Sequence, residues 1–256
     1  MTPNAPSLWR SDFPIPAQDG HKYHRGHARV VGSERYTGAT RLASEACSRI
    51  GAGLVTVWNE SQADLYRVTL PADLMVADHN LADLRGVSTV LAGPGGLSES
   101  QGEAVLSAYP SASYVLDADA IRFHTKVASN PCVVTPHEGE FERFFSPLEG
   151  NREGAAQSAA MRSNCVIVLK GARTLVCAPN GDVVTNATAS PYLAKAGTGD
   201  VLAGLIAGLV TQGMPAFSAA CAGVWLHGQA SERIGPGLIP QDLMGEIRPL
   251  LRDLLA

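Results

Sequence analysis

The chain has 256 residues, of which 45% are hydrophobic, and this length and composition predict one large α/β domain with a substantial buried core. Its 20 basic and 24 acidic residues give a formal net charge of −4, which offers no electrostatic footprint for nucleic acid or an anionic membrane and favours small-molecule partners. No apolar stretch reaches the roughly 20 residues needed to span a bilayer, and no secretion signal opens the chain, so we expect a cytoplasmic protein.

From residue 27 onward, short β-branched apolar runs alternate with helical patterns, which is typical of βαβ units around a parallel sheet. Stretches such as 38–50 and 154–162 carry apolar residues at helical spacing and are expected to pack on the sheet faces. Seven of the apolar runs are candidate strands: 28–32, 54–58, 74–77, 89–92, 114–117, 132–135 and 166–169.

We expect residues 1–20 to form an N-terminal arm over the core or over a neighbouring copy.

The segment 174–186 differs, because its two short runs flank Asn180 and Gly181, a pair typical of a hairpin turn. We expect an antiparallel hairpin that closes the edge of the sheet. Three helical stretches follow, at about 199–212, 216–234 and 241–255, and they complete a domain that extends over 21–256.

The five cysteines are scattered along the chain and show no metal-binding spacing. We expect them to be reduced thiols in the core.

The most informative local feature is 196–200, Ala-Gly-Thr-Gly-Asp, which runs directly into an apolar helix. Glycines at a helix entrance let backbone N–H groups converge on an anion, and the helix dipole adds to the attraction. Asp200 is expected in the first helical turn beside that anion, where it could accept a proton from a substrate hydroxyl. Glycine-rich turns with an acidic first turn are also common helix starts, so this feature alone leaves both interpretations open.

Three further segments each follow a predicted strand, at the end of a sheet where open α/β folds bind ligands. In 135–140, His137 could hydrogen-bond a substrate and Glu140 could act on a metal-bound water, although a capped helix start is an equal alternative. The glycines of 93–96 would let the backbone approach a ligand closely. The segment 170–174 supplies a cation, a hydroxyl and free amides for a nucleotide. Because these strands end on one side of the sheet, we expect the segments to meet.

Together these segments resemble the ADP- or ATP-dependent NAD(P)H-hydrate dehydratase family, a branch of the ribokinase-like superfamily. The resemblance covers about 21–255 and implies a three-layer α/β/α fold with a central, mostly parallel sheet, an antiparallel edge hairpin and a helical C-terminal third. It rests on many motifs in order: His21-Lys22 with Arg25-Gly26-His27, Tyr36-Thr37-Gly38-Ala39, 51–57, Gly93-Pro94-Gly95, Asp117-Ala118-Asp119-Ala120, 135–140, 170–174 and 197–200.

The resemblance implies the repair of hydrated NADH or NADPH in two stages, with ADP or ATP as phosphoryl donor and Mg²⁺ as cofactor. The nucleotide phosphorylates the hydroxyl on the hydrated ring, and phosphate then leaves. Matching positions assign Asp200 as the catalytic base, with the backbone amides of Gly197, Thr198 and Gly199 as the hole for the phosphoryl group. The resemblance also implies that Ala39, Gly95, His137 and Asp200 contact the hydrated dinucleotide. It implies contact with the AMP part of the nucleotide for Lys170, Gly171, Ala172, Arg173, Thr174 and Gly199. Glu140 is the implied contact with the metal.

Two departures bear on the dinucleotide contacts. The glycine-rich turn after the first strand is reduced to 32–35, Gly-Ser-Glu-Arg, and the usual Gly-Pro-Gly-Leu-Gly appears as Gly-Pro-Gly-Gly-Leu at 93–97. Lys195 is not expected from the family pattern. We interpret it as a solvated loop lysine, with contact to a nucleotide phosphate as the alternative.

Many relatives carry an N-terminal epimerase domain. Because about 20 residues precede the match, we expect any epimerase to be separate.

Two rival functions stay open beside the dehydratase. The first is a small-molecule kinase, such as a thiazole or pyrimidine-precursor kinase, against which His137 argues because superfamily kinases often carry Asn there. The second is a nucleotide-binding sensor without turnover, against which Asp200 argues because a carboxylate beside a phosphate repels the ligand. The resemblance also suggests a homo-oligomer, with a tetramer as one arrangement. The sequence does not decide between ADP and ATP or between NADH and NADPH hydrates.

Overall fold

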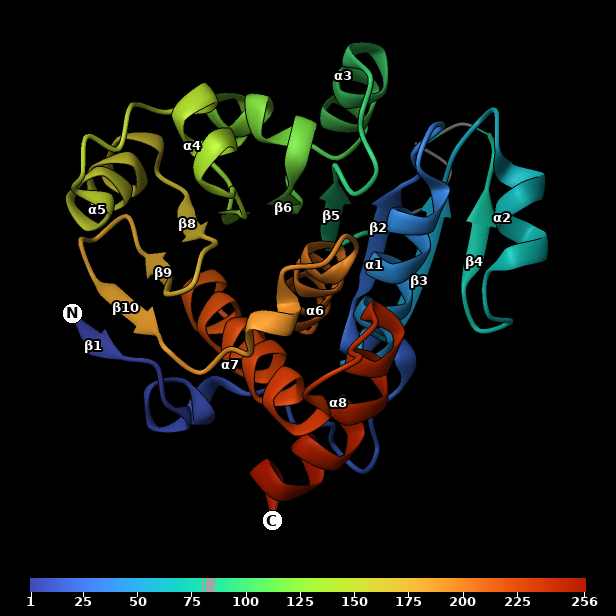
Figure 1. Ribbon diagram of the computed structural model, residues 1–256. Helices are drawn as coiled ribbons and strands as arrows, with labels where there is room; N and C mark the ends of the chain where they lie inside the picture. Colours follow the sequence, from blue (N-terminus) through green and yellow to red (C-terminus); the bar gives the residue numbers. More distant parts are fainter. Residues whose placement is uncertain (80, 82–85) are drawn as a thin grey trace.

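A single ten-stranded sheet runs through the computed structural model, which describes residues 1–79, 81 and 86–256 (Figure 1). The strand order is β1-β10-β9-β8-β7-β6-β5-β2-β3-β4. All seven runs expected as strands are strands β2 to β8, and the expected hairpin is β9 and β10. The bounds are β1 Thr2–Pro3, β2 His27–Val31, β3 Leu54–Trp58, β4 Met75–Ala77, β5 Thr89–Ala92, β6 Ser113–Leu116, β7 Cys132–Val134, β8 Val166–Leu169, β9 Thr174–Cys177 and β10 Val183–Asn186.

Strands β2 to β8 pair in parallel, so their carboxyl ends share one edge of the sheet. Strand β9 is antiparallel to β8 and to β10, as the Asn180-Gly181 turn predicts. The expectation that this hairpin closes the sheet is wrong, because β1 pairs in parallel with β10 and forms the edge. Two residues, one of them a proline, carry no strand pattern, and an edge position tolerates the missing N–H of Pro3.

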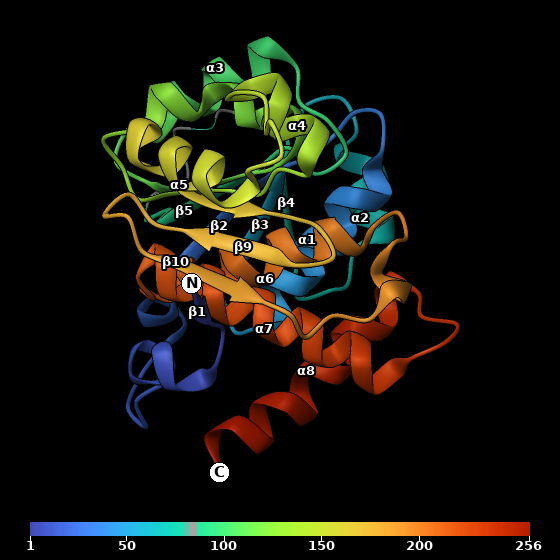
Figure 2. The ribbon, with the colours of Figure 1, turned by 60° about the vertical axis from the view of Figure 1, so that its left-hand side comes forward.

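Helices cover both faces of the sheet, which confirms the expected three-layer α/β/α arrangement. Helices α3, α4 and α5 lie on one face with the 3₁₀ segment η5, and α1, α6, α7 and α8 lie on the other (Figures 1 and 2). The bounds are α1 Thr37–Arg49, α2 Ala63–Thr69, α3 Glu99–Ala108, η5 Ala118–Val127, α4 Glu138–Phe144, α5 Arg152–Ser163, α6 Thr198–Thr211, α7 Ala216–Ile234 and α8 Pro240–Leu255.

Helix α6 is buried on all sides, from Val201 through Thr211. Small residues allow this, because Gly204 lies directly against the backbone of Ala43 in α1, where no Cβ would fit. A helix that is apolar all round is stable only inside a core. The amino end of α6 is therefore held rigidly at the carboxyl edge of the sheet.

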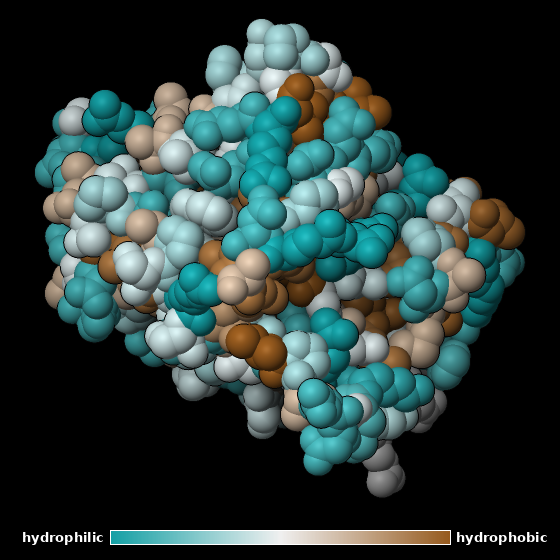
Figure 3. Space-filling view, turned by 90° about the horizontal axis from the view of Figure 1, so that it is seen from below, coloured by the Kyte–Doolittle hydropathy of each residue, from teal (hydrophilic) through white to brown (hydrophobic). Residues whose placement is uncertain are grey.

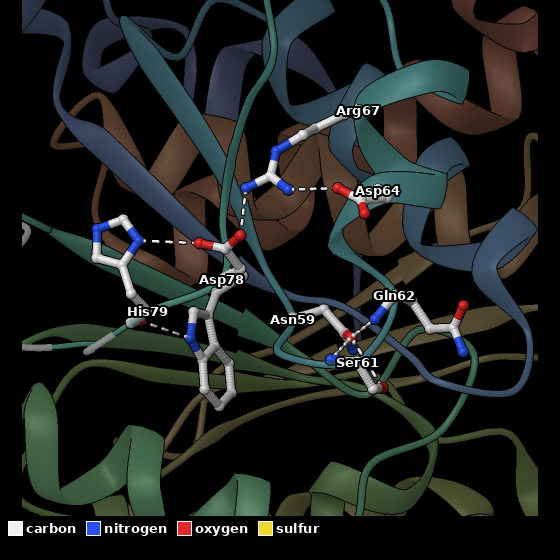
Figure 4. Close-up of polar contacts among 8 residues, drawn as sticks. Asn59, Ser61, Gln62, Asp64, Arg67, Asp78 and His79 are labelled. Atoms are coloured by element: carbon white, nitrogen blue, oxygen red, sulfur yellow. Dashed lines mark hydrogen bonds and ion pairs between the residues drawn. The ribbon is translucent and has the colours of Figure 1, made fainter.

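The far edge of the sheet carries a polar network beyond β3 and β4 (Figure 4). The side chain of Asn59 accepts hydrogen bonds from the backbone N–H groups of Ser61 and Gln62, at 3.0 and 2.6 Å, and so begins the turn into α2. Arg67 of α2 pairs with Asp64 and with Asp78, and its hydrogen bond lowers the pKa of Asp78 to about 2. These contacts hold α2 against the end of β4.

The surface seen from below shows hydrophobic residues in separate groups between hydrophilic ones (Figure 3). Among the described residues, no helix is long and apolar enough to cross a membrane. All five cysteines are buried as free thiols, as expected from the sequence.

Candidate functional site

The segments expected to meet are connected at the carboxyl edge of the sheet. Gly93, after β5, lies directly against the carbonyl of Asp117, after β6, and leaves no room for a Cβ. Asp117 Oδ1 accepts a hydrogen bond of 2.6 Å from Thr135 Oγ1, after β7, and pairs at 3.0 Å with Lys170 Nζ, after β8. The amino end of α6 adjoins them, because a Cβ at Gly199 would lie 3.5 Å from Lys170 Nζ.

Lys170 is surrounded by carboxylates from three elements. Its ammonium lies 3.0 Å from Asp117 Oδ1 and 3.9 Å from Glu140 Oε2, and it also interacts with Asp200. Burial lowers the pKa of Lys170, but the carboxylates outweigh burial, so the net pKa is raised and the side chain stays charged. The sequence did not predict a functional role for Asp117, although the motif 117–120 contributed to the resemblance.

Asp200 lies in the first turn of α6, as expected, and its carboxyl group has an unusual protonation equilibrium. Its pKa is raised to about 7, mainly by burial and further by the negative charge of Asp117 and of Glu140, while the positive charge of Lys170 opposes the rise. A carboxyl group with a pKa near neutrality is suited to accept a proton and later return it. The arrangement can therefore do acid–base chemistry at the amino end of a helix.

The turn before α6 has the geometry of an anion site made from backbone. Gly197 is the N-cap residue with φ of 98°, a conformation that glycine adopts without strain. Thr198 Oγ1 points into the protein, and its hydrogen is shared between the carbonyls of Leu193 and Lys195, at 2.8 and 2.9 Å. The backbone N–H of Thr198 makes a long contact of 3.4 Å with the carbonyl of Lys195, and the amides of Gly197 and Gly199 face the anion site. Lys195 itself is exposed.

His227 of α7 supports this turn from behind and was missed from the sequence. Its Nε2 donates a hydrogen bond of 2.9 Å to the carbonyl of Thr198. Burial lowers the pKa of His227 to about 4, so the ring is neutral and Nδ1 is an acceptor. A lone histidine on an apolar helix was the available signal, but only the contact distinguishes it from a core residue.

A first cavity of about 510 Å³ opens beside the turn, between the end of β8 and α7. It includes five of the six residues assigned to the nucleotide; Arg173 is absent from its lining, and its carbonyl accepts a hydrogen bond of 3.1 Å from Arg152. The sequence missed the opposite wall, from the loop before α6 and from α7, because those residues come together only in the fold. The lining residues are Lys170, Gly171, Ala172, Thr174, Asn186, Ala189, Ser190, Pro191, Leu193, Ala194, Thr198, Gly199, Leu202, Val224, His227 and Gly228.

A second cavity of about 440 Å³ is lined by Ala118 and Asp119, the two residues that follow Asp117 in the chain. Gly95 lines this cavity, whereas Ala39 and His137 are not among its lining residues. The sequence missed Asp119 and most of the turn after β2. The lining residues are Ser33, Glu34, Arg35, Tyr36, Gly95, Gly96, Leu97, Ser98, Gln101, Ala118 and Asp119.

His137 and Glu140 form the capped helix start that the sequence left as an alternative. His137 Nδ1 accepts from the backbone N–H of Glu140 at 3.2 Å, and Glu140 Oε2 accepts from the backbone N–H of His137 at 2.8 Å. The imidazole is 62% exposed, so the cap leaves it accessible to a ligand. Across the part of the chain that the structure describes, no group of three or more His, Cys, Asp or Glu side chains could hold a metal ion.

The fold and the site together define a three-layer α/β protein of the ribokinase-like class, in which a cavity lined by Lys170 and Gly199 adjoins a cluster of carboxylates at the carboxyl edge of the sheet. The model of the NAD(P)H-hydrate dehydratase family matches residues 29–244, and the chain belongs to this family. A ribokinase from Arabidopsis thaliana, at a TM-score of 0.58 and 11% identity over 87% of this chain and 98% of that one, shows the fold alone.

Three relatives are similar over most of the chain. The bifunctional NAD(P)H-hydrate repair enzyme of Gloeobacter violaceus is 38% identical over 89% of this chain and 49% of its own length, so the chain spans about half of that relative. The ADP-dependent (S)-NAD(P)H-hydrate dehydratase of Neisseria meningitidis is 32% identical over 94% of this chain and 89% of its own. The ADP/ATP-dependent NAD(P)H-hydrate dehydratase from Bacillus subtilis, co-crystallized with ATP and Mg²⁺, has a TM-score of 0.83 at 28% identity and covers 99% and 98%.

Proposed function

We propose that the chain restores NADH or NADPH from its hydrated form, with ADP or ATP as phosphoryl donor. The observation that carries this proposal is the charged cluster at the amino end of α6, where the pKa of Asp200 is raised to about 7 and Lys170 lines a cavity of about 510 Å³. A second cavity of about 440 Å³ lies at the same edge of the sheet, after β2, β5 and β6. One cavity suits the nucleotide and the other the hydrated dinucleotide. The terminal phosphate of the nucleotide would lie at the amino end of α6, where Gly199 lines the first cavity.

The residues of this cluster suit both stages of the reaction. The hydroxyl oxygen of the hydrated ring attacks the terminal phosphorus, its proton goes to Asp200, and the bond from phosphorus to AMP or ADP breaks. The amides of Gly197 to Gly199 and the charge of Lys170 would stabilise the phosphoryl group in transit. The carbon–oxygen bond then breaks, phosphate leaves with the electron pair, and a proton lost from the neighbouring ring carbon restores the double bond.

Mg²⁺ is proposed to accompany the nucleotide, as it does in phosphoryl-transfer enzymes generally. Mg²⁺ is generally held by one or two carboxylates together with substrate phosphates and water, so a dedicated cluster of protein ligands is not required. Glu140, 17% exposed beside Lys170, would be the carboxylate that supports it. The ion would neutralise charge on the phosphates of the donor.

One assay tests the proposed activity directly. Purified protein is mixed with hydrated NADH or hydrated NADPH and with ADP or ATP, and recovery of the reduced-nicotinamide absorbance is followed. We expect recovery that depends on the nucleotide and on Mg²⁺, and a comparison of the four combinations gives the preferred pair. Transfer of phosphate to a small alcohol without recovery of absorbance would indicate a kinase instead.

His137 is proposed to contact the hydrated dinucleotide, and its role as a helix cap can be separated from that contact. We expect His137→Ala to raise the KM for the hydrate more than the KM for the nucleotide, and to destabilise α4 by about 1 kcal/mol through the lost cap. His137→Asn is the control, because Asn retains a capping oxygen but not the imidazole. Steady-state kinetics and urea unfolding measure both effects; equal changes in the two KM values would reject the contact.

Thr198 is proposed to contribute its backbone, not its side chain, to the phosphate site. We expect Thr198→Ala to leave the dissociation constant for ADP or ATP within roughly tenfold of wild type, or about 1.4 kcal/mol, by calorimetric titration. Loss of the hydroxyl, whose hydrogen is shared between two carbonyls, should lower the free energy of unfolding by about 1 kcal/mol. Thr211→Ala, at the other end of α6, is the control for stability alone, since Thr211 Oγ1 donates to Ala207 at 2.7 Å. Loss of most nucleotide affinity would make the Thr198 hydroxyl the ligand.

We also propose that the protein acts in the cytoplasm as a homo-oligomer, a tetramer being the arrangement to test by sedimentation. The dehydratase would act on one epimer of the hydrate, so an epimerase activity would supply the rest. Addition of such an epimerase should bring recovery of a mixed hydrate from about half to completion.

A further inference from the structure

The N-terminal arm packs against the elements that form the far wall of the first cavity. Strand β1 pairs with β10 along the sheet edge, and the backbone N–H of Asn4 donates to Thr185 at 2.8 Å (Figures 1 and 2). Trp9 is fully buried, and its ring lies 5.7 Å from that of Trp225 in α7. These arm residues precede residue 29, where the family match begins.

The side-chain amide of Asn4 is fully used and has one possible orientation. Its Oδ1 accepts a hydrogen bond of 3.2 Å from Trp9 Nε1. Its Nδ2 donates to Asn186 Oδ1 at 3.0 Å and to the carbonyl of Cys221 in α7 at 2.8 Å. An amide has one acceptor and two donor hydrogens, so a flip of Asn4 would oppose like groups at all three contacts.

Asn186, which receives this hydrogen bond, is the last residue of β10 and lines the first cavity. Because its Oδ1 faces Asn4, its nitrogen must face the other way, and it donates to the carbonyl of Thr188 at 2.8 Å. Among the described residues this contact uses only one of the two N–H groups of the nitrogen. Asn186 is 2% exposed, so the orientation of its amide is fixed by these partners and not by water.

The same contacts set the course of the loop that follows β10. The carbonyl of Thr188 lies directly against Gly228 of α7, where a Cβ would not fit. The backbone N–H of Ser190 donates to Ser231 Oγ at 3.0 Å. Residues 189–191 then line the first cavity, so the position of the wall depends on Asn186 and Thr188.

We propose that Asn4 is a positioning residue for the nucleotide, because it fixes the orientation of the Asn186 side chain. That orientation directs the second N–H group of Asn186 toward an adenine nucleotide in the first cavity. It also sets the position of residues 189–191, which form a wall of that cavity. This inference rests on the assignment of the first cavity to the nucleotide. It makes the arm part of the nucleotide site. A neutral N–H donor suits the ribose oxygens or the ring nitrogens of adenine, which accept hydrogen bonds.

The first test compares two Asn→Ala variants that remove the same chemical group. We expect Asn4→Ala to raise the dissociation constant for ADP about tenfold by calorimetry, which corresponds to about 1.4 kcal/mol, and to leave the KM for the hydrate unchanged. Asn130→Ala is the matched control, because Asn130 Nδ2 also donates to two carbonyls, of Pro110 and Ala112, both at 2.9 Å. It lines neither cavity, so it should lose stability without losing ADP affinity.

A double-mutant cycle tests whether Asn4 acts through Asn186. In the Asn186→Ala background, Asn4→Ala should weaken ADP binding by less than about twofold, since coupled neighbours are not additive. A full additional tenfold loss, or unchanged ADP affinity in Asn4→Ala, would overturn the proposal. Hydrogen exchange provides a further test on the wild-type protein, without any variant. ADP should slow the exchange of the backbone N–H of Asn4, and an unchanged exchange rate would count against the inference.

The outcomes also separate this inference from the proposed function. If the wild-type protein binds neither ADP nor ATP, the nucleotide site is wrong and the inference falls with it. If the wild type binds ADP and Asn4→Ala binds it equally well, only the role of Asn4 is rejected.

Discussion

Asp200→Asn is expected to lower turnover by about a thousandfold or more while nucleotide binding stays nearly unchanged, because a general base acts mainly in the transition state. The wild-type kcat should fall as the pH falls through about 7, where the raised pKa of Asp200 places its protonation. Stopped assays of absorbance recovery between pH 5.5 and 8.5 measure both effects. Asp64→Asn is the control, since that carboxylate is exposed on α2.

The same substitution should stabilise the protein at alkaline pH. Folding raises the pKa of Asp200 from 3.8 to about 7, so the folded state favours the protonated carboxyl. This contribution is fully present below about pH 4 and is lost as the pH rises through about 7. Urea unfolding at pH 8 should therefore show Asp200→Asn more stable than wild type, with a smaller difference at pH 5. A variant that retains most of its turnover would remove Asp200 from the mechanism, whatever its stability.

Gly199→Val is expected to abolish turnover and to weaken ADP binding at least about a hundredfold while the protein still folds. Gly199 lines the first cavity in the first turn of α6, and its new side chain would occupy the space between the helix amides and Lys170 Nζ, which lies 3.5 Å from the Cβ position. Among the residues that the structure describes, only the ammonium of Lys170 lies close to this position, and the end of a flexible side chain can shift, so the fold should tolerate the change. Calorimetric titration with ADP and the absorbance assay measure the losses.

Two other glycines make this prediction specific. Gly245→Val is the matched control, because Gly245 lies inside α8 with open space at its Cβ position. Gly197→Ala should instead destabilise the fold, since Gly197 has φ of 98° and its Cβ would lie 2.8 Å from Pro240 and 2.9 Å from Leu42. Of the two glycines in this turn, Gly197 has the positive φ that favours glycine, whereas Gly199 is already helical. Normal turnover in Gly199→Val would place the phosphoryl group elsewhere.

Local sequence by itself determined most of the elements. The β-branched runs from β2 to β8, the Asn180-Gly181 turn and the start of α6 with Asp200 in its first turn were all predictable, because each depends on neighbours a few residues away. The family resemblance rested on the same local motifs. Strand β1 was not predictable, because Thr2 and Pro3 become a strand only through their pairing with β10.

Tertiary structure alone decided the chemistry of the site. The pKa of Asp200 near 7 arises from burial together with charges on Asp117, Glu140 and Lys170, which lie after β6, in α4 and after β8. The contact of His227 with the turn likewise joins residues that are 29 positions apart. Burial and electrostatic interaction depend on distance in space and not on spacing along the chain. The sequence could therefore predict Asp200 as the catalytic base but could not predict the pKa of its carboxyl group.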